Sequence, residues 1–305
     1  MGKLALVFPG QGSQSVGMGR ELAERYEAAA AVYEKANAIL DWDVAGLCFK
    51  GPADRLSRTE YAQVALYVNS IAAMAVLAEK GVRGEVVSGH SLGEYSALAA
   101  AGALGFEDGL KLVSLRGEAM GRLAGERPGS MAAILGLEDG EVERICAESG
   151  EVWPVNYNCP GQLVVSGETE AVHRAMARST DAGAKRAVML EVSGSFHSPL
   201  MRNASGEMRE HLAEVAFSEP EPPFLSSITC EYEAADGLAG VLVEQITSPV
   251  RWRQAVERLI ADGASRFFEV GNGKTLCGLI KRINRGVDAV NVSDPGSLDT
   301  AMASL

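Results

Sequence analysis

The chain has 305 residues, of which 47% are hydrophobic, and its formal net charge is −12. A chain of this length can bury a large core, as one large domain or as two smaller ones. The acidic balance argues against DNA or RNA as a partner, because nucleic-acid-binding proteins usually carry a basic surface. The sequence contains no apolar run of the roughly 18 residues that a membrane-spanning helix needs, which predicts a soluble protein with no membrane partner.

The five cysteines do not form a metal-binding or cross-linking pattern. Their number is odd, and no C-x-x-C spacing occurs among them. We therefore expect neither a disulfide framework nor a metal site. Reduced, structural thiols are typical of the cytosol, and we predict a cytoplasmic protein.

The first part of the chain alternates short apolar strands with helices. Residues 3–10 form an apolar segment that ends in Pro and Gly, as a buried strand followed by a turn would. Helical periodicity follows over residues 19–40 and 61–80. A strand, a sharp turn and a helix of small residues occupy residues 85–104, and another helix covers 106–124. This alternation predicts an α/β fold with an α/β-hydrolase-like parallel sheet flanked by helices.

The pattern changes near residue 124. The predicted elements are a strand at residues 131–137, a helix at 139–149, strands at 153–158 and 162–167, a helix at 168–183 and a strand at 185–192. This βαββαβ order is the ferredoxin-like arrangement. We predict a small ferredoxin-like domain at residues 123–197, inserted in a large catalytic domain made of residues 1–122 and 198–305.

The large domain then resumes with elements of the same two kinds. They are a helix at residues 197–217, a proline-rich crossing at 219–227, a helix at 248–264, a strand and turn at 266–275, a helix at 275–284 and a final strand at 287–294. These elements are expected to complete the sheet that residues 3–10 begin.

The strongest local signal is the pentapeptide Gly89-His90-Ser91-Leu92-Gly93, which matches G-x-S-x-G. It lies between the apolar strand and the small-residue helix, which is the context of a nucleophile elbow. Such a turn holds the serine clear of the backbone, and the helix that follows directs its N-terminal amides toward the site. The amide of Leu92 would then stabilise an oxyanion. The simpler alternative is an ordinary turn with Ser91 as a helix N-cap.

A serine nucleophile needs a base, and the chain has four histidines. His173 and His211 lie in charged helical segments, and His90 adjoins the serine too closely in sequence to reach its hydroxyl with good geometry. By elimination, His197 is the candidate base, at the junction of a predicted strand and helix. The alternative for His197 is a capping role at the start of that helix.

Arg116 lies in a mostly apolar helical segment, where an unpaired charge is costly. Two explanations stay open from the residues alone. Arg116 forms an internal salt bridge, for example with Glu94, or its guanidinium fork binds a substrate carboxylate in a bidentate manner.

Eight short segments together resemble one family, the malonyl-CoA:acyl-carrier-protein transacylases of fatty-acid and polyketide synthesis. They occur in that family's order and extend over nearly the whole chain. The segments are Phe8-Pro9-Gly10-Gln11-Gly12-Ser13-Gln14, Thr59-Glu60-Tyr61-Ala62-Gln63, Gly89-His90-Ser91-Leu92-Gly93-Glu94-Tyr95, Leu115-Arg116-Gly117, Asn156-Tyr157-Asn158 with Pro160-Gly161-Gln162, Phe196-His197-Ser198, Ser248-Pro249-Val250-Arg251-Trp252 and Glu269-Val270-Gly271. The inserted βαββαβ domain is also what this family's fold implies.

The resemblance implies catalytic roles. Ser91 is similar to the family's nucleophile, and His197 is similar to its general base and acid. The ring of this histidine is oriented in the family by a backbone carbonyl from the region of Arg251. The backbone amides of Gln11 and Leu92 resemble the family's oxyanion hole.

The resemblance also implies substrate-binding positions. Arg116 is similar to the arginine that binds the malonyl carboxylate, and Gln63 and Met120 match pocket-lining positions. His90 is expected to support the site without acting as the base. Phe196 stands where relatives that use methylmalonyl units typically have Ser, so its bulky ring favours malonyl.

The implied substrates are malonyl-CoA and a phosphopantetheinylated acyl carrier protein, with no metal and no redox cofactor. Carrier proteins of this pathway are acidic, so binding to this acidic chain needs a local positive patch. Lys274, Lys281, Arg282 and Arg285 cluster near the predicted helix at residues 275–284 and are the candidate docking surface. The alternative is that they form a solvated helix face.

Three other functions are alternatives to this one. A free-standing acyltransferase that serves a polyketide synthase would have the same residues. An α/β-hydrolase-type esterase would need an acidic triad member and would have no use for Arg116. A non-catalytic acyl-CoA-binding module would not need Ser91, His197 and Arg116 together.

Overall fold

The computed structural model describes residues 2–192 and 194–305, so Met1 and Ser193 lie outside the description. Its described strands form two separate sheets. The strands are β1 (Lys3–Phe8), β2 (Val86–Gly89), β3 (Ser130–Leu135), β4 (Val152–Cys159), β5 (Gln162–Gly167), β6 (Arg186–Met189), β7 (Phe224–Leu225), β8 (Ala264–Val270) and β9 (Asp288–Val292).

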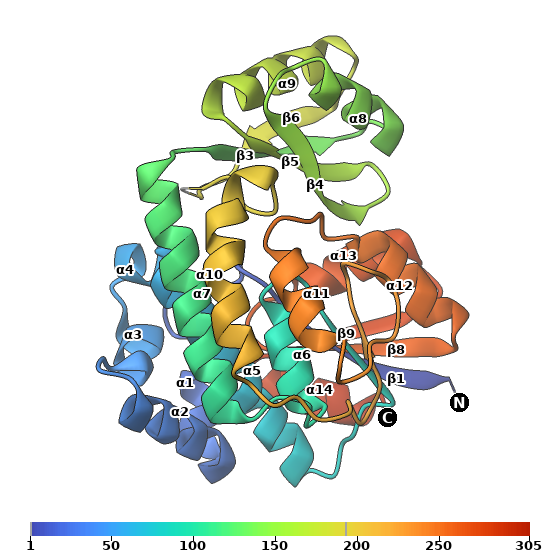
Figure 1. Cartoon of the computed structure of the whole chain (residues 1–305). Helices are drawn as coiled ribbons and strands as arrows, with labels where there is room; N and C mark the ends of the chain where they lie inside the picture. The colour runs from blue at the N-terminus through green and yellow to red at the C-terminus, as the bar shows by residue number, and fades with distance from the viewer. Residues whose placement is uncertain (1, 193) are drawn as a thin grey trace.

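Helices cover both faces of the larger sheet and one face of the smaller sheet (Figure 1). They are α1 (Arg20–Arg25), α2 (Glu27–Ile39), α3 (Val44–Lys50), α4 (Ala53–Ser57), α5 (Thr59–Glu79), α6 (Gly93–Ala100), α7 (Phe106–Glu126), α8 (Asp139–Ala147), α9 (Thr169–Asp181), the 3₁₀ helix η1 (Pro199–Met201), α10 (Arg202–Ala213), α11 (Leu238–Gln245), α12 (Trp252–Ala261), α13 (Thr275–Ile283) and α14 (Pro295–Ala303).

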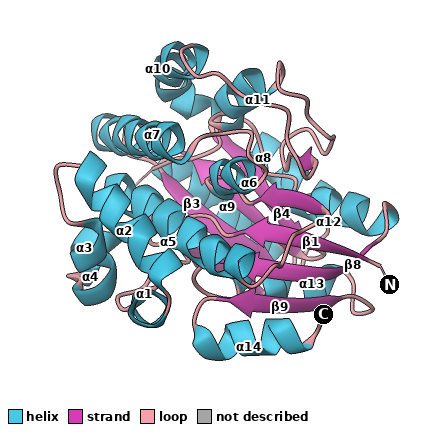
Figure 2. Cartoon of the chain, turned by 90° about the horizontal axis from the view of Figure 1, so that it is seen from below, coloured by secondary structure: helices cyan, strands magenta, loops and turns pink. Residues whose placement is uncertain are grey.

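The larger sheet has the strand order β7-β2-β1-β8-β9, and all of its described pairs are parallel. This confirms the predicted parallel sheet flanked by helices, and Figure 2 shows β1, β8 and β9 with helices on both sides. In open α/β sheets, ligands bind beyond the carboxyl ends of the strands. Here those ends include Phe8 of β1 and Gly89 of β2, so the segments that follow them are the natural place for a site.

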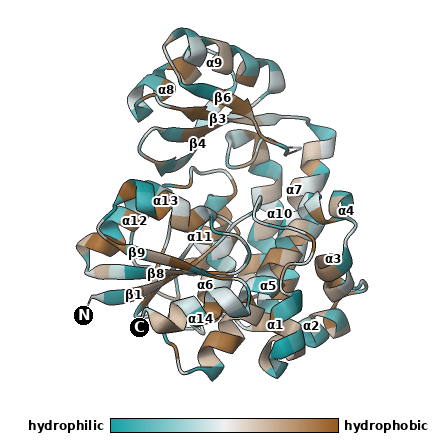
Figure 3. Cartoon of the chain, turned by 180° about the vertical axis from the view of Figure 1, so that it is seen from behind, coloured by the Kyte–Doolittle hydropathy of each residue, from teal (hydrophilic) through white to brown (hydrophobic). Residues whose placement is uncertain are grey.

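The two faces of the larger sheet are covered by different helices, because successive strand residues point to opposite sides. Leu4, Leu6 and Phe8 of β1 belong to the core that α5, α6 and α14 cover. Ala5 and Val7 belong to the second core, which α12 and α13 cover. Apolar residues, brown in Figure 3, gather along these strands. The sheet is thus buried on both faces and forms a rigid platform.

Helix α5 is the centre of the larger core. Its length and its mean hydropathy of 1.5 would suit a membrane span, but 72% of that stretch is buried inside the fold. A core helix of a globular domain has the same composition, because it is apolar all round. The helix predicted over residues 61–80 is this core helix, and its polar residues Gln63 and Asn69 are themselves buried.

The smaller sheet is antiparallel with the order β4-β5-β3-β6. With α8 and α9 it confirms the predicted ferredoxin-like arrangement, and it lies above the larger domain in Figure 1. One face of the sheet packs against α8 and α9 through Ile134, Val165 and their neighbours. The opposite face contributes Met131 and Val164 to the larger core. The limits of this domain at residues 123 and 197 remain a prediction.

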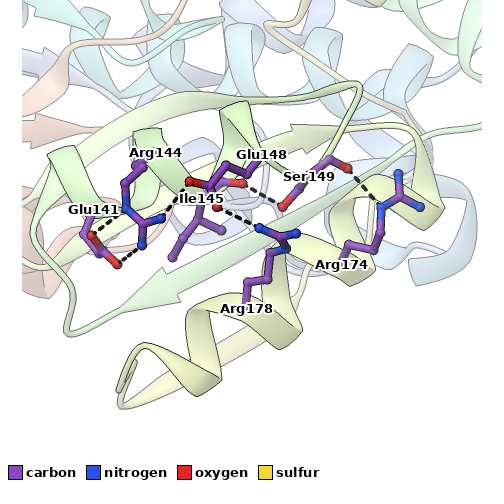
Figure 4. Close-up of polar contacts among 7 residues, drawn as sticks. All are labelled: Glu141, Arg144, Ile145, Glu148, Ser149, Arg174 and Arg178. Atoms are coloured by element: carbon purple, nitrogen blue, oxygen red, sulfur yellow. Dashed lines mark hydrogen bonds and ion pairs between the residues drawn. The ribbon is translucent and has the colours of Figure 1, made fainter.

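Ion pairs lie within α8 and between α8 and α9 of the small domain (Figure 4). Arg144 donates to Glu141 at 2.6 Å and to Glu148 at 2.8 Å, and Arg178 of α9 donates to the other oxygen of Glu148 at 2.8 Å. Exposed ion pairs of this kind contribute only about 0.2–1 kcal/mol each. Of these three pairs, the one between Arg178 and Glu148 joins α9 to α8, and all three add little to stability.

Some elements differ from those predicted. The helix expected over residues 19–40 is interrupted at Tyr26, whose extended backbone separates α1 from α2. The last strand of the small domain ends at Met189 and does not reach residue 192. Helix α10 begins only at Arg202, after the short 3₁₀ helix η1. Five elements were not predicted at all: α3, α4, α11, α14 and the two-residue strand β7.

Candidate active site

Ser91 lies in a tight turn between β2 and α6, as the G-x-S-x-G pattern predicts. Its φ is 54°, a left-handed value that a non-glycine residue rarely adopts. The turn requires glycine before and after it. A Cβ on Gly89 would lie 2.0 Å from the carbonyl carbon of Gly93, and a Cβ on Gly93 would lie 2.0 Å from the oxygen of Phe8. This close packing holds Ser91 at the carboxyl end of the sheet.

His197 meets Ser91 from the opposite side of the cleft. Ser91 Oγ lies 2.7 Å from His197 Nε2, and His197 Nδ1 lies 2.8 Å from the main-chain oxygen of Gln245. Because a carbonyl can only accept, Nδ1 carries the proton and Nε2 is free to accept one from the serine. His197 also has a left-handed φ of 60°. Both contacting residues are therefore held in uncommon backbone conformations, as is frequent at functional sites.

The expected position of the orienting carbonyl needs a correction. The resemblance pointed to the region of Arg251, but the acceptor for His197 is Gln245, earlier in the chain, at the end of α11. Helix α11 was not predicted, so its last residue could not be recognised as a partner. The principle holds, because a backbone carbonyl does orient the ring and no triad carboxylate contacts His197 among the described residues.

The environment of His197 favours its neutral form. The side chain is 5% exposed. Burial, and after it the nearby positive charge of Arg116, lower the pKa of His197 to about 3, although the hydrogen bond to the Gln245 carbonyl opposes the shift. A neutral imidazole with a free Nε2 can accept a proton from a hydroxyl.

Arg116 lies on α7 with its guanidinium directed at the serine. Its Nη2 donates to Ser91 Oγ at 3.2 Å and to Gln245 Oε1 at 2.9 Å, and its Nη1 donates to Gln63 Oε1 at 2.6 Å. The salt bridge with Glu94, one of the two alternatives from sequence, does not form: no carboxylate of the described residues lies within ion-pair distance of Arg116. The structure thus has a buried cation, 1% exposed, that is held by neutral oxygens.

The other residues singled out in the sequence surround this contact. Gln63 Nε2 donates to Met120 Sδ at 3.6 Å, so the pair adjoins Arg116. His90 Nε2 lies 3.0 Å from Asn158 Oδ1 and makes no contact with the Ser91 hydroxyl, as expected. Burial lowers the pKa of His90, although the hydrogen bond to Asn158 opposes this shift. His90 therefore links the serine turn to the small domain.

A small cavity joins these groups. Its volume is about 90 Å³, and its lining residues are Gln11, His90, Ser91, Arg116, Met120, Met131, Asn156, Leu190, Val192, Phe196 and His197. It adjoins a larger groove of about 530 Å³, with which it shares Gln11 and His90. The small cavity can take a short acyl group, and the groove can take an extended chain attached to it.

Two backbone amides, one from a residue that lines the small cavity and one from the residue that follows Ser91, have no acceptor among the described residues. Within the described parts of the chain, neither the N–H of Gln11 nor the N–H of Leu92 donates a hydrogen bond. Leu92 stands at the N-cap of α6, where helix amides normally have no intrahelical acceptor. Gln11 follows β1, and its side chain instead contacts Thr59 at 3.2 Å. These are the two amides for which the sequence predicts an oxyanion hole.

Three further polar residues belong to this site, and the sequence predicted no role for them. Gln245 contacts Ser91, His197 and Arg116, and Asn158 contacts His90. Asn156 lines the small cavity with an unpaired amide oxygen. A weak local signal for Gln245 exists, since it is a polar residue just after the apolar segment 238–243 of α11.

The predicted docking residues lie beside the groove. Thr275 and Leu279 of α13 line the groove, and the same helix carries Lys281 and Arg282. Arg282 Nη1 donates to Gln162 Oε1 of the small domain at 2.9 Å. Arg282 thus contacts a residue that lines the groove, and the docking role of the four basic residues remains a prediction.

A serine hydroxyl in contact with a neutral histidine, at the carboxyl ends of a parallel sheet and beside unpaired amides, is the arrangement of an enzyme that transfers or hydrolyses acyl groups. Comparison with known proteins specifies the class. The family model described as "Acyl transferase domain" matches residues 5–292. The malonyl CoA-acyl carrier protein transacylase of Bacillus subtilis is 41% identical to the chain, over 100% of this chain and 98% of that protein.

Two solved structures extend this similarity to the whole fold. An acyl carrier protein S-malonyltransferase from Vibrio cholerae matches with a TM-score of 0.94 at 42% identity, over 98% of this chain and 99% of the other. A malonyl-transacylase solved in complex with a type II PKS acyl-carrier protein matches with a TM-score of 0.97 at 39% identity, over 99% and 100% of the two chains. The chain belongs to the malonyl CoA-acyl carrier protein transacylase family of acyltransferases.

Proposed function

We propose that this enzyme transfers a malonyl group from malonyl-CoA to the phosphopantetheine thiol of an acyl carrier protein, through an ester on Ser91. The proposal rests on the hydroxyl of Ser91, which contacts both His197 and Arg116. Ser91 Oγ lies 2.7 Å from His197 Nε2 and 3.2 Å from Arg116 Nη2. A nucleophile, a base and a carboxylate-binding cation therefore converge on one point.

In the first half-reaction, Ser91 Oγ attacks the thioester carbonyl carbon of malonyl-CoA. His197 Nε2 takes the hydroxyl proton as the oxygen–carbon bond forms. The negative charge that develops on the carbonyl oxygen is stabilised by the amides of Gln11 and Leu92. The intermediate then collapses, the carbon–sulfur bond breaks, and the sulfur leaves with the proton from His197. The products are CoA and malonyl-Ser91.

Arg116 supplies selectivity for an acyl group with a terminal carboxylate. Its guanidinium is buried, and among the described residues it has neutral oxygen partners only and an unpaired Nε. A malonyl carboxylate in the small cavity would accept a charge-assisted, bidentate hydrogen bond from this fork. Gln63 and Gln245 hold the guanidinium in place. An acetyl group offers no such partner.

In the second half-reaction, the phosphopantetheine thiol enters along the larger groove. His197 removes the thiol proton, the sulfur attacks malonyl-Ser91, and the serine oxygen leaves with that proton. The reaction is of the ping-pong type, since CoA departs before the carrier binds. These steps use no metal and no redox cofactor.

The walls of the small cavity favour malonyl over its α-methylated form. Met120 and Phe196 both line the cavity, and its volume is only about 90 Å³. Exclusion of one methyl group is worth about 1–3 kcal/mol, so the preference is expected to be strong but incomplete.

Within this proposal the enzyme acts in the cytoplasm, where reduced cysteines such as its five are typical. The role we assign is in fatty-acid biosynthesis. A role in polyketide synthesis is the second candidate, because one of the matching structures is the complex of a malonyl-transacylase with a type II PKS acyl-carrier protein. An esterase is disfavoured, since Arg116 would have no function in it.

The test is to incubate the purified protein with malonyl-CoA, without carrier protein, and to measure the intact mass. A malonyl adduct that maps to Ser91 and is absent from Ser91→Ala is the expected result. His197→Ala should slow adduct formation, whereas His211→Ala, a matched change on α10, should not. Accumulation of free malonate without an adduct would indicate a hydrolase and would overturn the proposal.

A further inference from the structure

Gln245 connects the reactive groups of the site. Its side chain is fully buried. Its amide nitrogen donates to the main-chain oxygen of Ser91 at 3.0 Å and to Glu94 Oε2 at 2.5 Å, while its amide oxygen accepts from Arg116 Nη2 at 2.9 Å. Its main-chain oxygen accepts from His197 at 2.8 Å. One residue thus contacts the serine turn, the histidine and the arginine.

Glu94 stands behind Gln245 and has no contact with the cavity. It lies on α6 and is fully buried, with 0% exposure. Its Oε1 accepts hydrogen bonds from the amide of Ser227 at 2.6 Å and from the hydroxyls of Ser226 and Ser227 at 3.0 Å each. Gln245 donates to the other oxygen, so every partner of Glu94 among the described residues is a hydrogen-bond donor. An ionised carboxylate, which can only accept, requires such partners.

The carboxylate of Glu94, which can only accept, determines the orientation of the Gln245 side-chain amide. The two ends of a glutamine amide have nearly the same shape and differ only in donor and acceptor character. Because Glu94 Oε2 can only accept, the NH₂ group must face it, and the amide oxygen must then face Arg116. The reversed amide would direct its NH₂ group at the guanidinium, a donor against a donor. Glu94 therefore fixes the orientation on which Arg116 depends.

We propose that Glu94 is a positioning residue, which acts through the amide of Gln245 to hold Arg116 in the geometry that binds the substrate carboxylate. This inference rests on the proposed function and deepens it. Glu94 also places a negative charge behind the buried guanidinium, with one amide between them. The charge balances Arg116 without occupying the donors that the substrate needs, which a direct salt bridge would do.

The competing explanation is that Glu94 only ties the segment at Ser226 and Ser227 to α6. In that case its loss would reduce the amount of folded enzyme and affect all acyl substrates alike. The positioning role predicts a different result, because acetyl-CoA has no carboxylate for Arg116. The ratio of kcat/KM for malonyl-CoA to kcat/KM for acetyl-CoA separates the two explanations, since it does not depend on the concentration of active enzyme.

The experiment compares Glu94→Gln with Ser227→Ala as the matched control. Ser227→Ala removes one hydroxyl from Glu94 Oε1 and leaves Oε2 and Gln245 untouched. Glu94→Gln is expected to lower kcat/KM for malonyl-CoA on the order of 10- to 100-fold, the scale of a small displacement of a positioning group, and to lower the malonyl-to-acetyl ratio about as much. Ser227→Ala should leave the ratio unchanged. An unchanged ratio in folded Glu94→Gln would overturn the inference.

A second variant keeps the test decisive if Glu94→Gln folds poorly. Gln245→Met removes the amide but retains the main-chain carbonyl for His197, so it should reduce the ratio by a similar factor. In the double variant the two effects should not add, because both interrupt one chain of contacts. Additive losses would contradict the inference. Formation of malonyl-Ser91 by the unaltered enzyme is measured in parallel, and its absence would overturn the proposed function instead.

Discussion

Arg116 Nη2 donates to Ser91 Oγ at 3.2 Å, so the buried cation and the reactive hydroxyl are in direct contact. The same hydroxyl contacts His197 Nε2 at 2.7 Å. The cation lowers the pKa of His197, together with burial, which has the larger effect. A malonyl carboxylate bound at Arg116 would neutralise this charge, so substrate binding itself would make His197 a stronger base. Acyl selection and base strength are thereby linked through one residue.

The first prediction concerns the pH dependence of the acylation step. Burial and Arg116 lower the pKa of His197 to about 3, well below the usual value of about 6.5. A lowered pKa keeps the ring neutral as the pH falls through 6.5, so the base form persists. We expect kcat/KM for malonyl-CoA, which reports the free enzyme, to stay nearly constant from pH 8 to about 5.

Glu94 is the second titrating group to consider here, since burial raises its pKa. A loss of activity at the low end of the range that disappears in Glu94→Gln would belong to that carboxyl. A half-loss of kcat/KM near pH 6.5 in both proteins would contradict the account of His197. Loading rates measured by rapid quench across the range provide the data.

The second prediction concerns Arg116→Ala. Each hydrogen bond to a charged group is worth about 1.5–3 kcal/mol, so loss of the guanidinium should lower kcat/KM for malonyl-CoA by ~100- to 1,000-fold. The value for acetyl-CoA should change much less. Arg122→Ala is the control, because Arg122 lies on the same helix with 51% of its side chain exposed. Equal losses with both acyl substrates would show that Arg116 does not select for the carboxylate.

The third prediction concerns the stability of the serine turn. In Gly89→Ala the new Cβ would lie 2.0 Å from the carbonyl carbon of Gly93 and 2.3 Å from the amide of Glu94, both backbone atoms. We expect a loss of about 3 kcal/mol or more in the free energy of unfolding. Gly206→Ala on α10 meets no atom within 4 Å and should stabilise by about 0.5–1 kcal/mol. Denaturant unfolding of the two variants tests the contrast.

The sequence was sufficient to predict the serine turn and the two kinds of sheet, because their signals are local. The G-x-S-x-G turn needs glycines at fixed positions, and the alternation of strands and helices distinguishes the parallel sheet from the βαββαβ domain. The start of helix α14 also has a local signal. Asp294 caps it with Pro295 at the first helical position, and both residues are typical of a helix start.

Other parts of the site depend on tertiary contacts that no local pattern reveals. Strand β7 has only two residues and is defined by its pairing with β2. Arg116 could not be assigned from sequence, because the choice between Glu94 and a substrate carboxylate depends on where Gln245 lies. Gln245 is far from Ser91 in sequence, and the contact between them depends on how α11 packs within the large domain. Long-range polar networks of this kind emerge from packing.

The last prediction concerns the surface beside the groove. Lys281 donates to the main-chain oxygen of Val287, and Arg282 donates to Gln162, so both have structural contacts. Lys274 and Arg285 are exposed and form no ion pair with any carboxylate that the structure describes. If an acidic carrier docks here, Lys274→Glu with Arg285→Glu should raise KM for the carrier by ~10-fold or more and reduce its salt dependence.

Formation of malonyl-Ser91 should be unaffected by these changes, because loading from malonyl-CoA does not involve the carrier. Lys111→Glu with Arg83→Glu, two reversals at exposed positions outside α13, gives the matched change in net charge. Equal effects of the two charge changes on carrier use would mean that the whole-molecule charge matters and that α13 is a solvated face.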